Sequence, residues 1–217
     1  MKDWSFRNFA EDFDAHVNGQ LPWYPMVSEA TAFIAKNYIP HGGLVYDIGC
    51  STGNITKKLL PTIKDRNAKI FGIDEEESMI QTYVKNFIDD NCVSSECWSA
   101  ENYDYEPFDV AIVFLTTMFI EAKLQEDFLN YLYDKCNEGG CIILVDKTND
   151  DYGYISTVFK RLTMHFKVLN NLSAEDILLK ELMLSGVQRP IKDVTGYLPC
   201  AKQFFQMGEF KGWVIEK

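Results

Sequence analysis

Short apolar runs alternate with amphipathic stretches along most of this 217-residue chain. Runs such as LVYDI, DVAIVF and CIILV are typical of strands buried on both faces, and the stretches between them repeat apolar side chains at helical spacing. Strands are expected at residues 44–48, 69–73, 93–98, 109–114 and 141–145, and helices at 54–63, 78–88 and 121–136. The alternation predicts an α/β fold, a doubly wound and mostly parallel sheet with helices on both faces.

The end of the chain breaks this alternation. Residues 201–206 and 210–215 are two strand-like runs joined by a short turn, which predicts an antiparallel hairpin and completes a seven-stranded sheet. No repeat or linker divides the sequence, so we expect one domain spanning 1–217. Within it, 1–40 is an N-terminal helical lid, 41–150 the core, 151–199 an insert that is helical over 152–184, and 200–217 the terminal hairpin.

Charge and cysteine usage narrow the classes of function. The chain carries 21 Lys and Arg against 32 Asp and Glu, a net charge of −11 that disfavours binding to duplex nucleic acid. One small basic cluster, FKR…HFK at 159–167, either contacts a phosphate or is a solvated helix face. The six cysteines form no CxxC pair, and no segment has the length of a membrane span. We expect a cytoplasmic protein with no metal and no membrane partner.

A glycine turn carries the first sign of ligand binding. In VYDIGCSTGNIT, Gly49 and Gly53 join the first strand to the first helix, whose early N–H groups we expect to face a ligand. Asp74 ends the second strand, where an acidic residue binds the two hydroxyls of a ribose. The alternatives are a plain turn and an acid that stabilises the next helix, a role also open to the adjacent Glu75. The lack of an Arg near Asp74 disfavours a 2′-phosphorylated nucleotide.

These motifs resemble those of the class I S-adenosylmethionine-dependent methyltransferases, whose sheet also ends in a hairpin. The matching segments are DIGCSTG at 47–53, GID at 72–74, SAE at 99–101 and FLTT at 114–117. The resemblance implies S-adenosylmethionine, or its carboxylated form, as the cofactor. It implies a cofactor site made of Tyr24, Asp47, Gly49, Cys50, Ser51, Gly53, Asp74, Glu75, Ala100, Glu101 and Phe114.

Within this set the implied roles differ. Asp47 orients the amino group of the methionine part, Ala100 and Glu101 face the adenine, and Phe114 lines the floor near the sulfonium. Glu101 has an alternative as a solvated loop carboxylate. Cys50 is either a thiol activated by the helix start or a residue packed beneath the turn.

A narrower resemblance extends over nearly the whole chain. The combination FD…HV…LPWY at 13–24 with VYDIGCS at 45–51 is similar to the carboxy-S-adenosylmethionine synthases of bacterial tRNA wobble-uridine modification and their phage relatives. It implies that Tyr24 reaches over the cofactor; the alternative is packing on Trp23 and Phe33. The sequence departs from those synthases at Phe114, where they carry an Asn.

Two cations follow the helical insert, Arg189 and Lys192. If a carboxylated ligand is bound, Arg189 is the better candidate, because its guanidinium matches a carboxylate in two hydrogen bonds. The alternative is a surface arginine. The synthase relatives also suggest a homodimer.

We therefore expect a methyltransferase that acts on a small molecule or on a nucleotide or tRNA-related acceptor, by in-line displacement at the sulfonium. The alternatives are a carboxy-S-adenosylmethionine synthase and a non-catalytic binder of the cofactor. Tyr24 and Arg189 are the candidate catalytic residues. Asp146, Asp150 and Asp151 stand where a general base would, or they cap the next helix.

Overall fold

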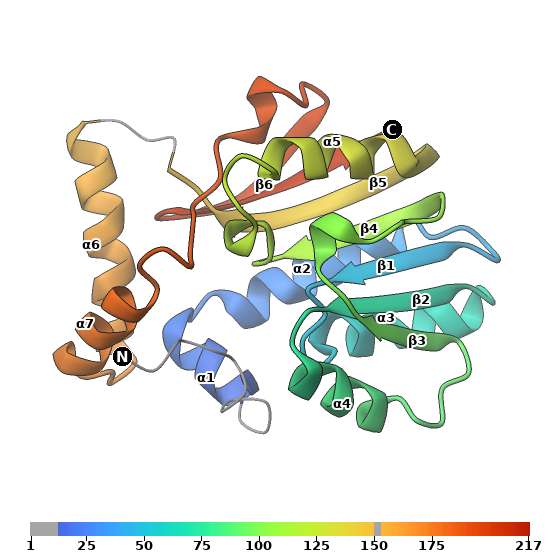
Figure 1. Ribbon diagram of the computed structural model, residues 1–217, viewed down its shortest axis with the longest axis horizontal. Helices are drawn as coiled ribbons and strands as arrows, with labels where there is room; N and C mark the ends of the chain where they lie inside the picture. Colours follow the sequence, from blue (N-terminus) through green and yellow to red (C-terminus); the bar gives the residue numbers. More distant parts are fainter. Residues whose placement is uncertain (1–12, 150–152) are drawn as a thin grey trace.

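The computed structural model describes residues 13–149 and 153–217, and its centre is a seven-stranded sheet of order β3-β2-β1-β4-β5-β7-β6 (Figure 1). The strands are β1 (Leu44–Ile48), β2 (Lys69–Asp74), β3 (Val93–Cys97), β4 (Phe108–Phe114), β5 (Cys136–Lys147), β6 (Ala201–Met207) and β7 (Phe210–Glu216). Strands β1 to β5 are parallel, and β7 runs antiparallel to both β5 and β6. The predicted doubly wound sheet and terminal hairpin are confirmed.

Alternation along the strands divides the core into two layers, since successive side chains of a strand point to opposite faces. Val110 and Ile112 of β4 pack in the same apolar cluster as residues of helices α2 and α3. Ala111 and Val113 pack in the cluster that contains residues of α5 on the opposite face. The helices are α1 (Phe13–Gln20), α2 (Tyr24–Lys36), α3 (Asn54–Asp65), α4 (Glu77–Asn86), α5 (Gln125–Lys135), α6 (Tyr154–Leu169) and α7 (Ala174–Met183).

The segment that connects β3 to β4 has aromatic side chains that cover this part of the sheet, where an α-helix would usually lie. A single 3₁₀ turn, η2 (Ala100–Asn102), follows β3. Tyr103 and Tyr105 then pack against the ring of Tyr46 in β1, with ring centroids 6.1 and 5.1 Å away. These rings supply the apolar cover that a crossover helix would otherwise provide.

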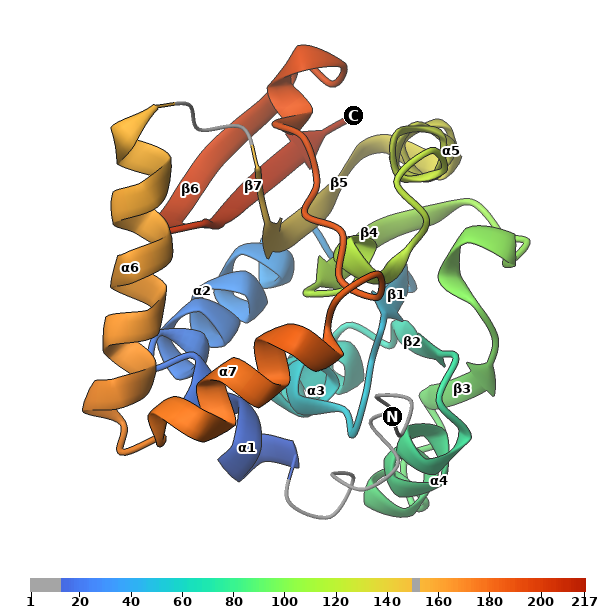
Figure 2. The same ribbon diagram turned by 60° about the vertical axis from the view of Figure 1, so that its left-hand side comes forward.

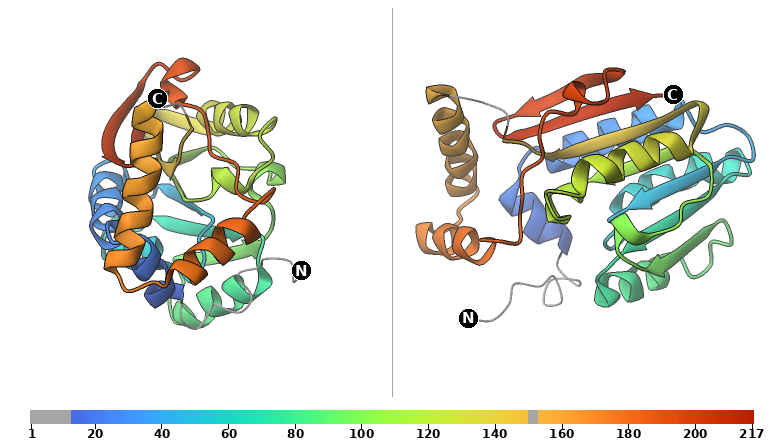
Figure 3. Two further views of the ribbon diagram at one scale, coloured as in Figure 1. Left: turned by 90° about the vertical axis from the view of Figure 1, so that its left-hand side faces the viewer. Right: turned by 45° about the horizontal axis from the view of Figure 1, so that its top comes forward.

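Helices α1, α6 and α7 gather beyond the carboxyl ends of the central strands (Figures 1 and 2). The end view and the tilted view in Figure 3 agree on this placement. The segment α6 to α7 lies between β5 and β6 in the chain, where the sequence predicted a helical insert. A parallel α/β sheet binds ligands at this edge, so these helices lie where a cover would be needed.

Two elements begin four or more residues away from the positions predicted from the sequence. The helix expected from residue 121 begins at Gln125, because Thr117–Phe119 forms a 3₁₀ turn and the Gln125 side chain donates to the backbone carbonyls of that region. The strand expected from residue 141 begins at Cys136, and its first residues include two glycines that carry no apolar signal. Neither difference moves the sheet edge at which the glycine turn lies.

Candidate functional site

A cavity of about 470 Å³ opens at the carboxyl ends of β1, β2 and β4. Helices α1, α2, α6 and α7 supply part of its wall. All of the residues implied by the resemblance border it except Gly53: Tyr24, Asp47, Gly49, Cys50, Ser51, Asp74, Glu75, Ala100, Glu101, Phe114 and also Arg189. Positions far apart in sequence are therefore brought to one enclosed volume, of the size typical for a small-molecule site.

The two glycines of the turn are needed for different reasons. Gly49 has φ 71°, and a Cβ there would lie 2.0 Å from Thr116 Oγ1, so only glycine allows β1 and β4 to meet at the cavity floor. Gly53 has φ 93° at the start of α3, and a Cβ there would lie 2.3 Å from the Phe87 ring. Gly53 does not border the cavity, and its lack of a side chain serves the packing of α4 and Phe87 against the turn. Its contact with the cofactor stays a prediction.

The backbone N–H groups of the turn mostly have partners inside the protein. Gly49 and Cys50 donate to the Ile73 carbonyl, at 2.7 and 3.0 Å, and Ser51 donates to Asp74 Oδ2 at 2.9 Å. The Thr56 amide, in the first turn of α3, donates to Asp47 Oδ2 at 3.2 Å. Of the early helix N–H groups expected to face a ligand, that of Thr56 is therefore used inside the protein.

Asp47 borders the cavity at the end of β1 and is buried, with 2% of the residue exposed. Its Oδ2 accepts from the hydroxyl of Thr56 at 2.7 Å as well as from the Thr56 amide, and the Thr56 hydroxyl also contacts the hydroxyl of Tyr83 at 2.9 Å. Burial raises the pKa of Asp47 to about 7, against the two hydrogen bonds from Thr56, and the charge of Asp74 adds to the rise. A bound cation would favour the ionised form.

Asp74 is fixed by two backbone amides. Oδ2 accepts from Ser51 and Oδ1 accepts from Glu76, both at 2.9 Å. Burial raises its pKa to about 6, opposed by these two hydrogen bonds. The bond to the Glu76 amide is the helix-start role considered as an alternative, and the side chain also borders the cavity. Each carboxylate oxygen has two acceptor sites, so both roles are compatible.

Further carboxylates surround this end of the cavity. Glu75, Glu76 and Glu101 border it together with Asp47 and Asp74, and no Lys or Arg among the described lining residues comes from the turn, β2 or η2. Partial burial raises the pKa of Glu75, and the charges of Glu101 and Glu76 raise it further. Such a concentration of negative charge favours a cationic ligand.

Trp98 was missed by the sequence reasoning. It borders the cavity beside Ala100 and Glu101, is 53% exposed, and donates its indole N–H to the Asn102 carbonyl at 3.2 Å. An aromatic face at the end of β3 is a stacking surface for a planar base. The available signal was a Trp at the last position of the predicted strand 93–98.

Tyr24 lies against the floor of the cavity. Its ring meets that of Phe114 edge to face, with centroids 5.4 Å apart, and its hydroxyl accepts from Asn54 Nδ2 at 3.3 Å. The alternative packing on Trp23 and Phe33 is not what the structure has, since Phe33 is 66% exposed and Trp23 packs on aromatic rings of the terminal hairpin.

Cys50 and Asp146 are both buried, in surroundings that fit a structural role. Cys50 is 4% exposed beneath the turn in a cluster with Tyr83 and Phe87, and burial raises the pKa of its thiol well above the ordinary value. These surroundings favour a packed, neutral thiol over an activated thiolate. Asp146 is fully buried and accepts from the backbone amides of Met118 and Lys147. It does not border the cavity, so the general-base role is not supported; Asp150 and Asp151 lie outside the described residues.

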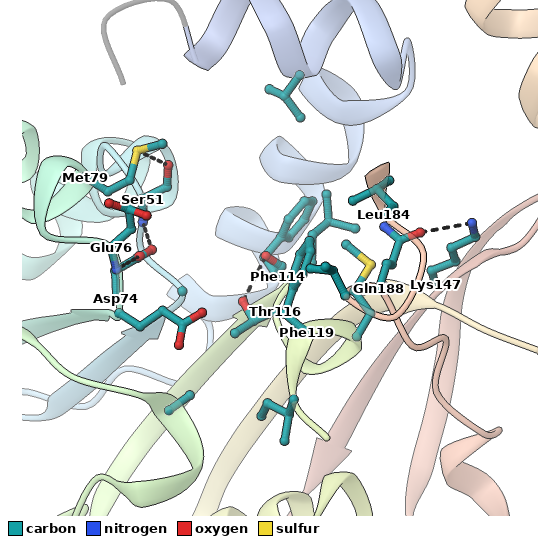
Figure 4. Close-up of a pocket in the computed structure, with 18 of the residues that line it drawn as sticks. Ser51, Asp74, Glu76, Met79, Phe114, Thr116, Phe119, Lys147, Leu184 and Gln188 are labelled. Atoms are coloured by element: carbon teal, nitrogen blue, oxygen red, sulfur yellow. Dashed lines mark hydrogen bonds between the residues drawn. The ribbon is translucent and has the colours of Figure 1, made fainter. Parts of the chain in front are cut away.

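The opposite end of the cavity is cationic. Figure 4 places Ser51, Asp74 and Glu76 on one side and Lys147 with Gln188 on the other, with Phe114 and Thr116 between them. The charged groups at the second end are Lys147, Lys167, Lys180, Glu181 and Arg189.

From the sequence, Arg189 was a candidate site residue and Lys167 belonged to the basic cluster considered for phosphate contact, whereas Lys147 and Lys180 were not singled out. The Arg189 Nη1 donates to the carbonyls of Phe119 and Val187, at 3.3 and 3.1 Å, which holds the guanidinium at the cavity wall. Lys192, the other cation considered, is exposed and does not border the cavity. The basic cluster on α6 divides: Lys160 and Arg161 are exposed, and Lys167 is buried at the cavity.

Within residues 13–149 and 153–217, no group of three or more His, Cys, Asp or Glu is arranged to hold a metal ion. In the same ranges, no helix is long and apolar enough to cross a membrane.

Comparison with known proteins agrees with this geometry. Residues 45–140 match the family model described as a methyltransferase domain. The chain is similar in fold to a Methanococcus maripaludis protein assigned to the S-adenosyl-L-methionine-dependent methyltransferases, with a TM-score of 0.61, 16% identity, and coverage of 100% of this chain and 96% of that one. It is also similar to PKMT2 from Rickettsia typhi in complex with AdoHcy, with a TM-score of 0.57, 13% identity, and coverage of 85% and 52%. The chain therefore has the class I methyltransferase fold, and the comparisons support an S-adenosylmethionine-dependent transferase.

A curated relative is similar over most of both chains. The carboxy-S-adenosyl-L-methionine synthase of Staphylococcus epidermidis is 29% identical over 191 residues, which cover 87% of this chain and 82% of that protein.

Proposed function

We propose that the chain transfers the methyl group of S-adenosylmethionine to a small molecule enclosed in the cavity between the sheet edge and helices α1, α6 and α7. The observation that carries the proposal is the division of this one cavity into a carboxylate-rich end and a cationic end. The carboxylate-rich end fits a cofactor with an ammonium group, a sulfonium and a ribose. The remaining volume is closed over by helices, which fits a small acceptor better than a duplex.

The proposed roles follow from position. Asp74 binds the ribose hydroxyls, held in place by the amides of Ser51 and Glu76. Asp47, supported by Thr56, faces the ammonium group. Trp98 and Glu101 flank the adenine, and the ring of Phe114 lies toward the sulfonium.

The chain's contribution to catalysis is mainly alignment and exclusion of water. S-adenosylmethionine supplies a methyl group on a positively charged sulfur, which is already an activated leaving group. The residues between the two ends, Tyr24 and Phe114, are packed edge to face and present apolar surface to the reacting atoms. A rigid apolar wall of this kind holds two reactants in line and keeps water from competing.

The test is methyl transfer from isotopically labelled S-adenosylmethionine into a small-molecule extract, followed by chromatography of the labelled product. The proposal predicts a labelled low-molecular-weight product with the wild-type chain and none with Asp74→Ala. Glu77→Ala, which removes an exposed carboxylate three residues away, is the matched control and should keep the product. Label only in macromolecules, or no transfer at all by a chain that binds the cofactor, would contradict the proposal.

A second candidate function is carboxy-S-adenosylmethionine synthesis. It is favoured by the similarity to the Staphylococcus epidermidis synthase and by the position of Arg189 at the cavity wall. In that case the cofactor is itself the substrate, and a carboxyl group is added to its methyl carbon.

Mass spectrometry of the molecule that copurifies with the chain separates the two functions. A bound species heavier than S-adenosylmethionine by the mass of carbon dioxide supports the synthase. Bound S-adenosylmethionine or S-adenosylhomocysteine supports the methyltransferase. Arg189→Lys keeps the charge but loses the paired hydrogen bonds, so it should remove the carboxylated species selectively if the synthase is the true function.

A further inference from the structure

We propose that the end of the cavity formed by β5, α6 and α7 binds an anionic group, a carboxylate or a phosphate, of the small molecule that receives the methyl group. The inference rests on the proposed function and names the class of its substrate. Lys147 at the end of β5, Lys167 on α6 and Lys180 on α7 come from three separate elements and border the same volume. Their convergence carries the proposal.

The lysines are gathered around one acidic side chain. Lys167 is 6% exposed and donates to Glu181 Oε1 at 2.9 Å. Lys147 donates to Gln188 Oε1 at 3.1 Å, and its Nζ lies 3.9 Å from Glu209, which is outside the cavity lining. Among the described residues that border this end, Glu181 is the one carboxylate. Three lysines from three elements therefore lie at the same end of the cavity as this one carboxylate.

The pKa values of Glu181 and Lys180 reflect the closeness of these charged groups. Burial opposes the ionisation of Glu181, but the hydrogen bond from Lys167 and the charges of all three lysines hold its pKa below the ordinary value. Burial and the nearby charge of Lys167 lower the pKa of Lys180 to about 8, against the attraction of Glu181. Like charges brought together out of water repel, and a bound anion removes that repulsion.

Gln20 on α1 adds an independent sign of a ligand. It is 8% exposed and borders the cavity, and its Oε1 is buried without a hydrogen-bond partner among the described residues. Buried side-chain acceptors nearly always have a donor, and leaving one without a donor costs free energy. A ligand that presents an N–H or O–H to Gln20 beside its anionic group would satisfy both features.

The relative positions of the two ends of the cavity fit such a molecule. Phe114 and Thr116 separate the carboxylate-rich end from Lys147 and Gln188 (Figure 4). A molecule anchored by its anionic group among the lysines would extend its remaining part past these residues toward the sulfonium. The opposite charges of the two ends would also keep the anionic molecule out of the cofactor's place.

The test is calorimetric titration of small probes into the chain saturated with S-adenosylhomocysteine. Succinate is the carboxylate probe and glycerol 3-phosphate the phosphate probe, with succinamide and glycerol as their neutral counterparts. The proposal predicts binding of at least one anion and of neither neutral probe, and the anion that binds identifies the chemistry.

Variants locate the site. Lys167→Met and Lys180→Met should each weaken anion binding about tenfold to a hundredfold, the loss typical of one hydrogen bond to a charged group. Lys180→Arg keeps the charge and should retain most of the affinity. Lys160→Met, an exposed position on α6, is the matched control. Thermal unfolding of each variant distinguishes lost binding from lost folding.

Proton uptake gives a readout that a purely structural lysine would not. At about pH 8.5 part of the Lys180 population is neutral, since its pKa is about 8, and an anion that raises this pKa draws in a proton. The uptake, measured from the heats in two buffers of different ionisation enthalpy, should disappear in Lys180→Met. Equal binding of anions and neutral probes, or unchanged anion affinity in both Met variants, would overturn the inference. Failure of S-adenosylhomocysteine itself to bind would instead overturn the proposed function.

Discussion

Replacement of Asp47 by Asn separates the stability of the fold from its function. Asp47 is fully enclosed, and its Oδ2 accepts from the amide and the hydroxyl of Thr56. An Asn side chain in the same position keeps a carbonyl oxygen for both donors and has no charge. We therefore expect Asp47→Asn to fold more stably than the wild type near neutral pH and to bind the cofactor more weakly.

The magnitude follows from linkage. The pKa of Asp47 is about 7 in the folded chain against 3.8 for the free group, so the folded chain holds its proton over this window when the unfolded chain has lost it. Stability therefore falls as the pH rises from about 4 to about 7 and is level above that. At roughly 1.4 kcal/mol per pKa unit, the raised pKa of Asp47 lowers the free energy of unfolding by about 4 kcal/mol at pH 8. At pH 5, where Asp47 is ionised in the unfolded chain but protonated in the folded chain, the loss is about 2 kcal/mol. Asp47→Asn has no ionisable group at this position, so its free energy of unfolding is not lowered in this way.

The assay is urea unfolding of both chains without ligand at pH 5 and pH 8. The stability advantage of Asp47→Asn should be larger at pH 8 by roughly 2 to 3 kcal/mol. Asp74, which titrates in the same window, is present in both chains and cancels to first order. Cofactor affinity at pH 8 should fall about tenfold to a hundredfold, since a charged hydrogen bond is lost. An advantage that does not change with pH, or an unchanged cofactor affinity, would refute this reasoning.

Three further changes test other parts of the site. Gly53→Ala should unfold at a clearly lower denaturant concentration than Gly139→Ala. Both glycines have positive φ, but only at Gly53 does the added Cβ meet a side chain, the ring of Phe87. Equal losses of stability in the two variants would argue against the packing role. Among the described residues, Trp98 is the tryptophan that borders the cavity, so titration with S-adenosylhomocysteine should change the tryptophan fluorescence of the wild type, and Trp98→Phe should remove most of that change. Tyr24→Phe should leave the methyl-transfer rate within about twofold, whereas Tyr24→Ala, which opens the wall, should lower it at least about tenfold; similar rates for the two would show that the ring is not needed.

The sheet could be predicted from the sequence because each central strand is a continuous apolar run and the terminal hairpin has a clear turn. The carboxylate-rich end of the cavity could also be predicted from the sequence, because a glycine turn and an acid at the end of the next strand have fixed places in this architecture. The packing role of Gly53 could not be predicted, because it depends on Phe87. That residue is 34 positions away and contacts the turn only when α4 is packed against it.

The cationic half could not be predicted in the same way. Lys167 and Lys180 belong to two helices of an insert, and lysines on a helix are by default solvated. Which face of α6 and α7 turns toward the sheet edge is decided by tertiary packing, and so is their approach to Lys147 at the end of β5. Arg189 was found only because the resemblance suggested a carboxylated ligand.

The measurement that tests the central claim most directly is calorimetric titration of S-adenosylhomocysteine into the wild-type chain and Asp74→Ala, with Glu77→Ala as the control. The account predicts one bound molecule per chain for the wild type and for Glu77→Ala. It predicts a loss of affinity of at least about a hundredfold for Asp74→Ala, which removes the two hydrogen bonds proposed to the ribose. No heat of binding with the wild type, or full affinity in a folded Asp74→Ala chain, would contradict it.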